Sequence, residues 1–252
     1  MVIPPIGHNR IELETVSSTN NYTMHLLENQ DVAEGTAVIA GFQTKGKGQD
    51  KNLWVSDAGT NLLFSIVLYP GFLPATEQFI LNKVLSLAIL DFIKLYIPRS
   101  KGTIKWPNDI YTGEKKIAGI LVQNSIKGNH IEHSIAGIGV NINQEIFPDF
   151  APPATSLKIE TGKEQDLRKC IDALFKKIEL RYHQLRSEAK ETIHWDYLHA
   201  LFRFNTLHNY QINQRKFQAR IIGVNEYGKL ILEEKNKDRL ECDIKGIRFL
   251  SD

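Results

Sequence analysis

The densest group of chemically useful side chains lies between residues 105 and 116, in the sequence KWPNDIYTGEKK. Asn108 and Asp109 follow a proline, which cannot donate to a sheet ladder and therefore ends the preceding strand. Lys116 opens an apolar segment after a turn that contains Gly113. An amide, a carboxylate and an ammonium group held at strand ends can bind and activate a polar ligand. An ordinary hairpin with solvated charges is the alternative interpretation.

A second candidate is the loop TKGKGQDKNLW at residues 44–54. Its two glycines, separated by one residue, can present backbone N–H groups to phosphate, and its lysines add positive charge. The loop lacks the GxxxxGK[ST] spacing of a P-loop, so a solvent loop without a ligand is the alternative. Trp54 at its end could stack on a base.

Two further groups of polar side chains adjoin predicted secondary structure. Ser17 to Asn20 precede a helix, which they could cap or whose N-terminus they could help to present to a ligand. Asn141 and Asn143 end a small-residue strand and could equally be a turn signal. Gly137 and Gly139 in that strand leave one face open, which favours a planar ligand.

Apolar strands and helices must position these groups. The pattern predicts strands at 35–44, 61–68, 104–106, 116–122 and 133–143, and helices from about residue 20, over 75–97, over 166–185 and over 191–204. Polar residues of 75–97, Lys83 and Ser86 among them, fall on half of the helical wheel, so the other half should back the sheet. We expect an α/β (α+β) fold, with a mixed sheet backed by helices over 1–203 and a small C-terminal β-barrel over 204–252.

Composition excludes several classes of protein. The chain has 252 residues and a net charge of +2, too mild to argue for a nucleic-acid partner. Its two cysteines, Cys170 and Cys242, disfavour a disulfide framework and a thiolate zinc site, and they fit a reducing cytoplasm. The first residues lack a signal-peptide pattern, and no apolar stretch is long enough to span a bilayer. We expect a cytoplasmic protein with no membrane partner.

Seven motifs, in order, resemble those of the biotin protein ligases. They are SSTN at 17–20, GFQTKGKGQDKNLW at 41–54, NLLFSIVL at 61–68, KWPNDI at 105–110, KIAGILVQ at 116–123, GIGVNIN at 137–143 and TSLKIETG at 155–162. The resemblance implies a class II synthetase-like catalytic domain with an SH3-like C-terminal barrel. It also implies that biotin and ATP, with Mg²⁺, form biotinyl-adenylate, whose biotin is passed to a lysine of a biotin carboxyl carrier protein of a carboxylase such as acetyl-CoA carboxylase. Such chemistry needs positioning, cationic stabilisation and exclusion of water.

The resemblance also implies a role for each matching residue. Lys116, Asp109 and Lys47 would be catalytic, with Lys116 on the carboxyl and phosphate groups and Asp109 orienting or deprotonating the incoming amine. The biotin-binding residues would be Ser18, Thr19, Asn20, Gln43, Lys47, Gly48, Gln49 and Lys116. The ATP- or adenylate-binding residues would be Gly46, Trp54, Lys105, Asn108 and Asn141, with Trp54 stacked on adenine. No residue is expected to ligate a metal.

The loop at 45–52 departs from the family pattern GRGRxGRxW. Gln49 and Asn52 replace arginines, and Lys47 lacks the guanidinium fork that binds phosphate through two parallel hydrogen bonds, so we expect a loosely held adenylate. The alternatives are a lipoate or octanoate ligase or transferase and a non-catalytic biotin-binding module. Because the first motif begins at Ser17, we expect no N-terminal DNA-binding domain and no DNA partner. The resemblance allows a homodimer.

Overall fold

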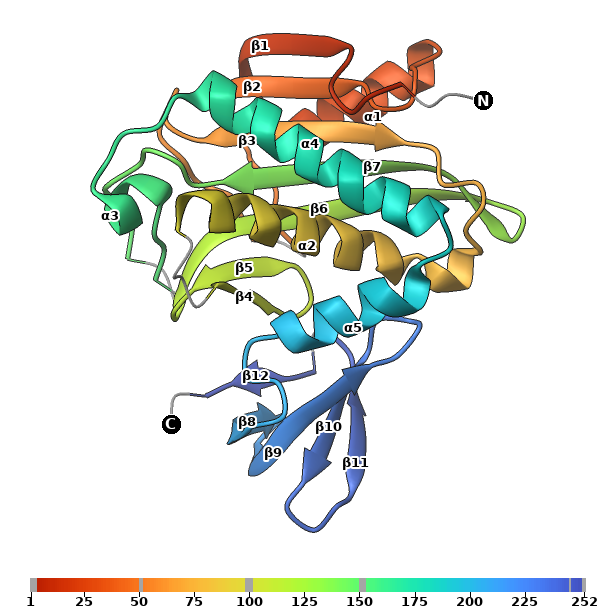
Figure 1. The fold of residues 1–252 in the computed structure, drawn as a ribbon, viewed down its shortest axis with the longest axis vertical. Helices are drawn as coiled ribbons and strands as arrows, with labels where there is room; N and C mark the ends of the chain where they lie inside the picture. The colour runs from red at the N-terminus through yellow and green to blue at the C-terminus, as the bar shows by residue number, and fades with distance from the viewer. Residues whose placement is uncertain (1–3, 50–51, 98–101, 150–152, 245, 251–252) are drawn as a thin grey trace.

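The structure, a computed structural model, describes residues 4–49, 52–97, 102–149, 153–244 and 246–250. Figure 1 shows a large sheet crossed by long helices and a smaller sheet formed by the C-terminal part of the chain. The described helices include none that is long and apolar enough to cross a membrane.

The large sheet has seven strands in the order β1-β2-β3-β7-β6-β5-β4. They are β1 (Arg10–Val16), β2 (Ala37–Gln43), β3 (Leu62–Leu68), β4 (Gly102–Lys105), β5 (Asp109–Thr112), β6 (Lys115–Lys127) and β7 (His130–Val140). β1 is parallel to β2, and the other neighbours are antiparallel. The pairing of β3 with β7 joins the two halves of the sheet and sets Ser65 opposite Gly137.

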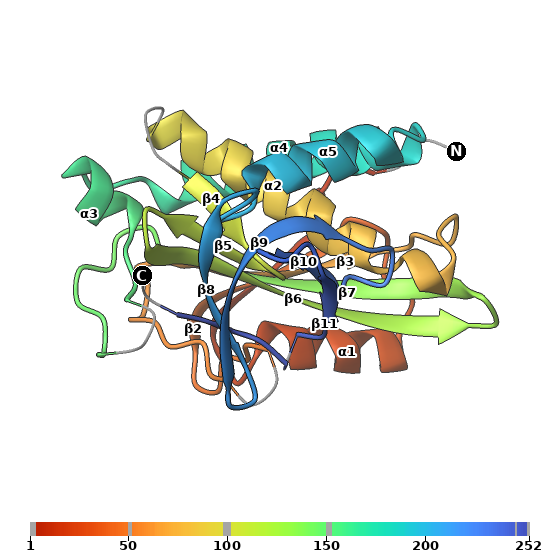
Figure 2. The same cartoon turned by 90° about the horizontal axis from the view of Figure 1, so that it is seen from below.

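Helices cover both faces of this sheet. Figure 2 shows α1 (Thr19–Asn29) on one face and α2 (Phe79–Tyr96), α4 (Leu167–Arg186) and α5 (Lys190–Ala200) on the other. A short 3₁₀ turn, η1 (Ala75–Glu77), precedes α2, and α3 (Leu157–Thr161) precedes α4. α2 is apolar around most of its circumference because strands lie on one side of it and α4 and α5 on the other.

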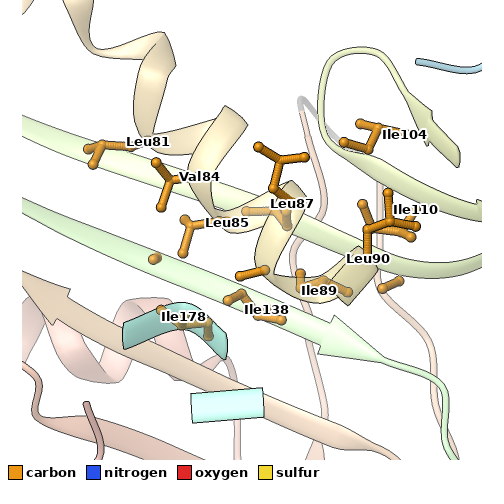
Figure 3. Packing of buried hydrophobic residues seen from close by; sticks show 14 of the residues in the cluster. Leu81, Val84, Leu85, Leu87, Ile89, Leu90, Ile104, Ile110, Ile138 and Ile178 are labelled. Atoms are coloured by element: carbon orange, nitrogen blue, oxygen red, sulfur yellow. The ribbon is translucent and has the colours of Figure 1, made fainter. Parts of the chain in front are cut away.

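The main core lies between α2 and the sheet. β3 is buried along its whole length, as its continuous apolar sequence predicts. Figure 3 shows Leu85 and Leu90 of α2 directed into this core, with Ile110 and Ile138 of the strands and Ile178 of α4 nearby. This core makes the sheet a rigid support for the polar groups on its opposite face.

The C-terminal strands form a second sheet in the order β11-β10-β9-β8-β12. They are β8 (Leu207–Ile212), β9 (Arg215–Val224), β10 (Leu230–Glu234), β11 (Arg239–Cys242) and β12 (Arg248–Phe249). The predicted mixed sheet backed by helices is therefore confirmed, and a C-terminal sheet is present where a small β-barrel is predicted. The boundary between residues 203 and 204 remains a prediction.

Several details of the expected fold are wrong. β1, β5 and β8 lie outside the predicted strands, and Asp109 begins a strand instead of following one. Lys83 and Ser86 were expected on the exposed half of the α2 wheel, but their exposed fractions are 6% and 0% because α4 and α5 cover that side. A helical wheel separates the polar face of a helix from its apolar face, but it does not show whether other helices pack on the polar face.

Candidate functional site

A cavity of about 240 Å³ lies on the face of the sheet that carries α1. The described residues that line it are Ser18, Thr19, Asn20, Gln43, Lys47, Gly48, Gln49, Asn52, Leu53, Trp54, Pro107, Asn108, Asp109, Lys116, Gly119, Ile120, Leu121, Gly137, Ile138, Gly139 and Ile244. Eleven of the fourteen predicted site residues are therefore gathered around one space. Gly46, Lys105 and Asn141 are the predicted residues that this lining lacks.

Lys116 and Asp109 form an ion pair on one wall of the cavity, with 2.7 Å between Nζ and Oδ1. Asp109 follows the turn at Pro107, and the Nδ2 of Asn108 donates to the carbonyl of Ile120, which ties this turn to β6. The register of the β5–β6 pairing shifts between Ile110 and Tyr111. Such bulges commonly redirect side chains beside active sites. About a quarter of each charged side chain is exposed, so both groups can reach a ligand.

The N-terminus of α1 contributes a hydrogen-bonded polar network to the lining of the same cavity. The backbone N–H of Thr19 and its hydroxyl lie 2.7 Å and 3.1 Å from Oε1 of Gln43. Ser65 donates to Oδ1 of Asn20 at 2.6 Å, and Nδ2 of Asn20 lies 3.0 Å from Oε1 of Gln123. Ser18 occupies the N-cap position, yet its side chain makes no capping hydrogen bond in the described structure. The capping interpretation is therefore wrong for Ser18, whose side chain lines the cavity.

Glycines in β6 and β7 let flat groups lie against the sheet. A Cβ atom on Gly139 would lie 2.4 Å from Cε2 of Trp54, and one on Gly119 would lie 3.1 Å from its Cζ3. A Cβ atom on Gly137 would lie 2.1 Å from Oδ1 of Asn20. The open face expected from the glycine spacing therefore accommodates the Trp54 indole and the Asn20 amide.

The loop after β2 forms a small hairpin over the cavity. Lys47 pairs with Leu53 in an antiparallel bridge, and the N–H of Gly48 donates to the carbonyl of Asn52 at 2.8 Å. The Gly48 amide is thus engaged within the loop. Lys47 Nζ reaches Oδ1 of Asn21 at 2.7 Å, which keeps its ammonium beside α1. Residues 50 and 51, part of the predicted loop, lie outside the described residues.

The three predicted residues outside the cavity lining, Gly46, Lys105 and Asn141, each form a hydrogen bond with another part of the protein. The carbonyl of Gly46 accepts a hydrogen bond from the backbone N–H of Trp54 at 2.9 Å, which joins the two ends of the loop. Asn141 is buried and donates to the carbonyl of Thr155, while its Oδ1 has no hydrogen-bond partner among the described atoms. Lys105 donates to the hydroxyl of Tyr111 at 3.0 Å, and burial lowers its pKa.

The residues at or near the cavity that the sequence did not identify include Ser65, Gln123 and Ile244. Ser65 and Gln123 complete the network around Asn20, and Ile244 lines the cavity from the connection between β11 and β12. Ser65 is the one polar residue inside the apolar run LLFSIVL, a signal that could have identified it. Nothing in the local sequence of Ile244 indicates its contact with a distant part of the chain.

The donor set of the cavity does not fit a protein-held magnesium ion. Mg²⁺ takes six oxygen ligands in octahedral geometry. Asp109 is the single carboxylate among the described residues of the lining, and Lys116 already neutralises it. No group of three metal-ligating side chains occurs in the described part of the chain. We therefore assign no reaction step to a metal held by the protein.

Comparisons with known proteins identify the family of the chain. The model of the biotin/lipoate A/B protein ligase family matches residues 12–141, just over half of the chain. The chain is 29% identical over 231 residues to the bifunctional ligase/repressor BirA of Bacillus spizizenii, covering 90% of this chain and 70% of that protein. It is 35% identical over 145 residues to the biotin–[acetyl-CoA-carboxylase] ligase of Paracoccus denitrificans, covering 54% of this chain and 58% of that protein.

A solved structure extends the likeness over almost the whole chain. Biotin protein ligase from Aquifex aeolicus, in complex with biotin and ATP, superposes with a TM-score of 0.79 and 26% identity. The superposition covers 96% of this chain and 100% of that one, so it includes the C-terminal sheet. By its sequence motifs, its matched region and its fold, this chain belongs to the biotin/lipoate A/B protein ligase family.

Proposed function

We propose that this chain is a biotin protein ligase, which activates biotin with ATP and transfers it to a lysine of a biotin carboxyl carrier protein. The observation that carries the proposal is that two kinds of polar group line one cavity. One is the neutral hydrogen-bonding network of Thr19, Asn20 and Gln43, and the other is the charged pair of Lys116 and Asp109. A ureido ring needs neutral donors and acceptors, whereas a carboxylate next to a phosphate needs cations.

The first step joins biotin to AMP. A carboxylate oxygen of biotin attacks the α-phosphorus of ATP, the bond from that phosphorus to the bridging oxygen breaks, and pyrophosphate leaves. Lys116 and Lys47 supply positive charge to the phosphoryl oxygens, where charge is concentrated in the transition state. Trp54 and Asn141 remain our candidates for the adenine. Mg²⁺ would accompany ATP as the counter-ion of its phosphates.

The second step transfers biotin to the carrier. The lysine amine of the carrier attacks the acyl carbon of biotinyl-adenylate, the C–O bond to phosphate breaks, and AMP leaves. The amine must be neutral to attack, and Asp109 accepts its proton or orients its N–H. Lys116 lies closest to Oδ1 of Asp109, so we assign this contact to the second carboxylate oxygen, Oδ2.

A direct assay tests the proposal and separates it from the alternatives. The protein is incubated with ATP, a biotin carboxyl carrier domain, and biotin, lipoate or octanoate in parallel, and the carrier is analysed by mass spectrometry. We expect one biotinylated lysine and no lipoylated or octanoylated product. Biotin binding without product would instead support a non-catalytic module. We expect the partner to be a carboxylase carrier domain in the cytoplasm, with no DNA or membrane partner.

The family also contains lipoate enzymes, and this gives the second candidate its support. Biotin is favoured because the cavity ends on the amide-rich network around Asn20, whereas the lipoyl and octanoyl groups carry no matching donors. An apolar acyl chain offers this network no hydrogen-bond partner, so it gains none of the polar contacts that are open to a ureido ring.

A further inference from the structure

Lys105 lies at the junction of the two sheets instead of at the cavity. Its ammonium donates to Tyr111 Oη at 3.0 Å and lies 5.1 Å and 5.4 Å from the ring centroids of Tyr111 and Phe249. Phe249 belongs to β12 of the C-terminal sheet, where it pairs with Tyr210. An ammonium group between two aromatic rings is held by cation–π attraction, which strengthens as water is excluded.

The same lysine is one tight turn away from Asp109. Lys105 and Asp109 are direct partners in the β4–β5 pairing, with a three-residue turn between them. Asp109 is in turn 2.7 Å from Lys116. A shift of Lys105 therefore moves the backbone that carries Asp109, because a short antiparallel hairpin transmits displacement directly across its hydrogen bonds.

A second contact holds the other side of this turn. Nε1 of Trp106 donates to the carbonyl of Gly228, in the β9–β10 connection, at 2.9 Å. The consecutive residues Lys105 and Trp106 thus reach two separate segments of the C-terminal sheet. Phe202, next to the start of that sheet, closes the junction by donating its N–H to Ile104.

We propose that Lys105 is a positioning residue that fixes Asp109 opposite Lys116 by attaching the β4–β5 hairpin to Phe249. The inference rests on the proposed ligase function and names how the C-terminal sheet acts on its site. It replaces the ATP contact that the sequence resemblance implies for Lys105. The C-terminal sheet contributes through the hairpin, and ATP binding itself does not need the Lys105 ammonium.

A double-mutant cycle distinguishes a role of Lys105 in positioning Asp109 from a direct contact of Lys105 with ATP. We expect Lys105→Met and Phe249→Leu each to lower kcat about tenfold while changing KM for ATP less than about twofold. The double variant should be no slower than the slower single variant, because both changes break one contact. Lys105→Arg should retain most of kcat, since it keeps the charge over the rings. The exposed Arg248→Met in the same strand is the matched control and should behave as wild type.

Two results would overturn the proposal. One is a rise in KM for ATP in Lys105→Met with Phe249→Leu unaffected, which would make Lys105 an ATP contact. The other is an unchanged rate of amide hydrogen exchange at residues 102–112 in both variants, which would show that the hairpin does not depend on the contact. The exchange measurement needs no substrate. Its outcome is therefore distinct from a failure of the wild-type protein to biotinylate a carrier.

Discussion

Lys116 and Asp109 form an ion pair across the β5–β6 hairpin, although the proposed reaction uses the ammonium in the first step and the carboxylate in the second. Both side chains are about a quarter exposed, and partly exposed pairs of this kind contribute little to stability. The pair is better explained by positioning, because each group restricts the rotamers of the other. A change at either residue should therefore affect both steps, to different degrees.

Lys116→Ala should lower the rate of adenylate formation by roughly 10²- to 10³-fold, as removal of a preorganised transition-state donor does elsewhere. Asp109→Asn should slow transfer to the carrier more than adenylate formation, because the amide cannot accept the proton. Pyrophosphate release measures the first step, and transfer from preformed biotinyl-adenylate measures the second. If Lys116→Ala released pyrophosphate at the wild-type rate, the proposed role of Lys116 in adenylate formation would be wrong.

Gly137→Ala should weaken biotin binding about 10- to 100-fold, because a displaced Asn20 amide loses one or two buried hydrogen bonds, each worth about 1–2 kcal/mol. The new methyl group would stand 2.1 Å from Oδ1 of Asn20. Gly71→Ala is the control, since the nearest atom to its Cβ would be 3.9 Å away. Isothermal titration with biotin measures the effect. Equal affinities of the two variants would contradict the role of the network.

Gln49→Arg should slow dissociation of biotinyl-adenylate by about tenfold, because a charge-assisted hydrogen bond to phosphate contributes about 1.5–3 kcal/mol. Gln49 lines the cavity in the loop where the resemblance expects arginine. Gln49→Leu has no donor and is the matched control, so it should not slow dissociation. Stopped-flow displacement of the adenylate measures the rate. If Gln49→Arg leaves it unchanged, the weak-loop hypothesis is wrong.

Lys83→Met should change how stability depends on pH. Burial lowers the pKa of Lys83 to about 8, and its contact is His194 Nδ1 at 2.9 Å. Between pH 8 and the ordinary value of 10.5 the unfolded chain binds a proton that the folded chain has released. The wild type should therefore gain free energy of unfolding relative to Lys83→Met as pH rises through this interval, by on the order of 3 kcal/mol.

Urea denaturation at pH 7, 8, 9 and 10 measures this difference. At pH 7 both states of the wild type carry the charge and the folded state bears its full desolvation cost, so Lys83→Met should be the more stable protein. Lys94→Met, at an exposed position in the same helix, is the control and should show no such trend. A constant difference between wild type and Lys83→Met from pH 7 to 10 would contradict a buried, charged Lys83.

The sequence predicted those residues of the candidate site that lie within recognisable motifs. Asp109, Lys116 and Thr19 are identifiable because their neighbours form recognisable patterns, and the structure brings them to one cavity. The partners of Asn20 were missed, because Ser65 and Gln123 are 45 and 103 residues away from it. Periodicity reports the face of an element and contains no information about which distant element meets that face.

Lys105 shows the same limit in a different form. Its motif, KWPND, implies a ligand contact for the whole run of residues, yet Lys105 and Asp109 belong to different strands and their side chains contact different partners. The structure directs Lys105 toward Phe249 and Asp109 toward Lys116. The identity of Phe249 as the partner depends on how the C-terminal sheet folds back, and local sequence does not encode that arrangement.

The pairing of β3 with β7 has a consequence for how the protein acquires its site during translation. Trp54 and Asn20 emerge from the ribosome early, but the glycines against which they pack, Gly137 and Gly139, are made more than eighty residues after Trp54. Contacts between such distant segments form slowly because their loop must close first. A nascent chain that stops before β7 therefore lacks the surface against which Trp54 and Asn20 pack, and the cavity stays incomplete until β7 has been made.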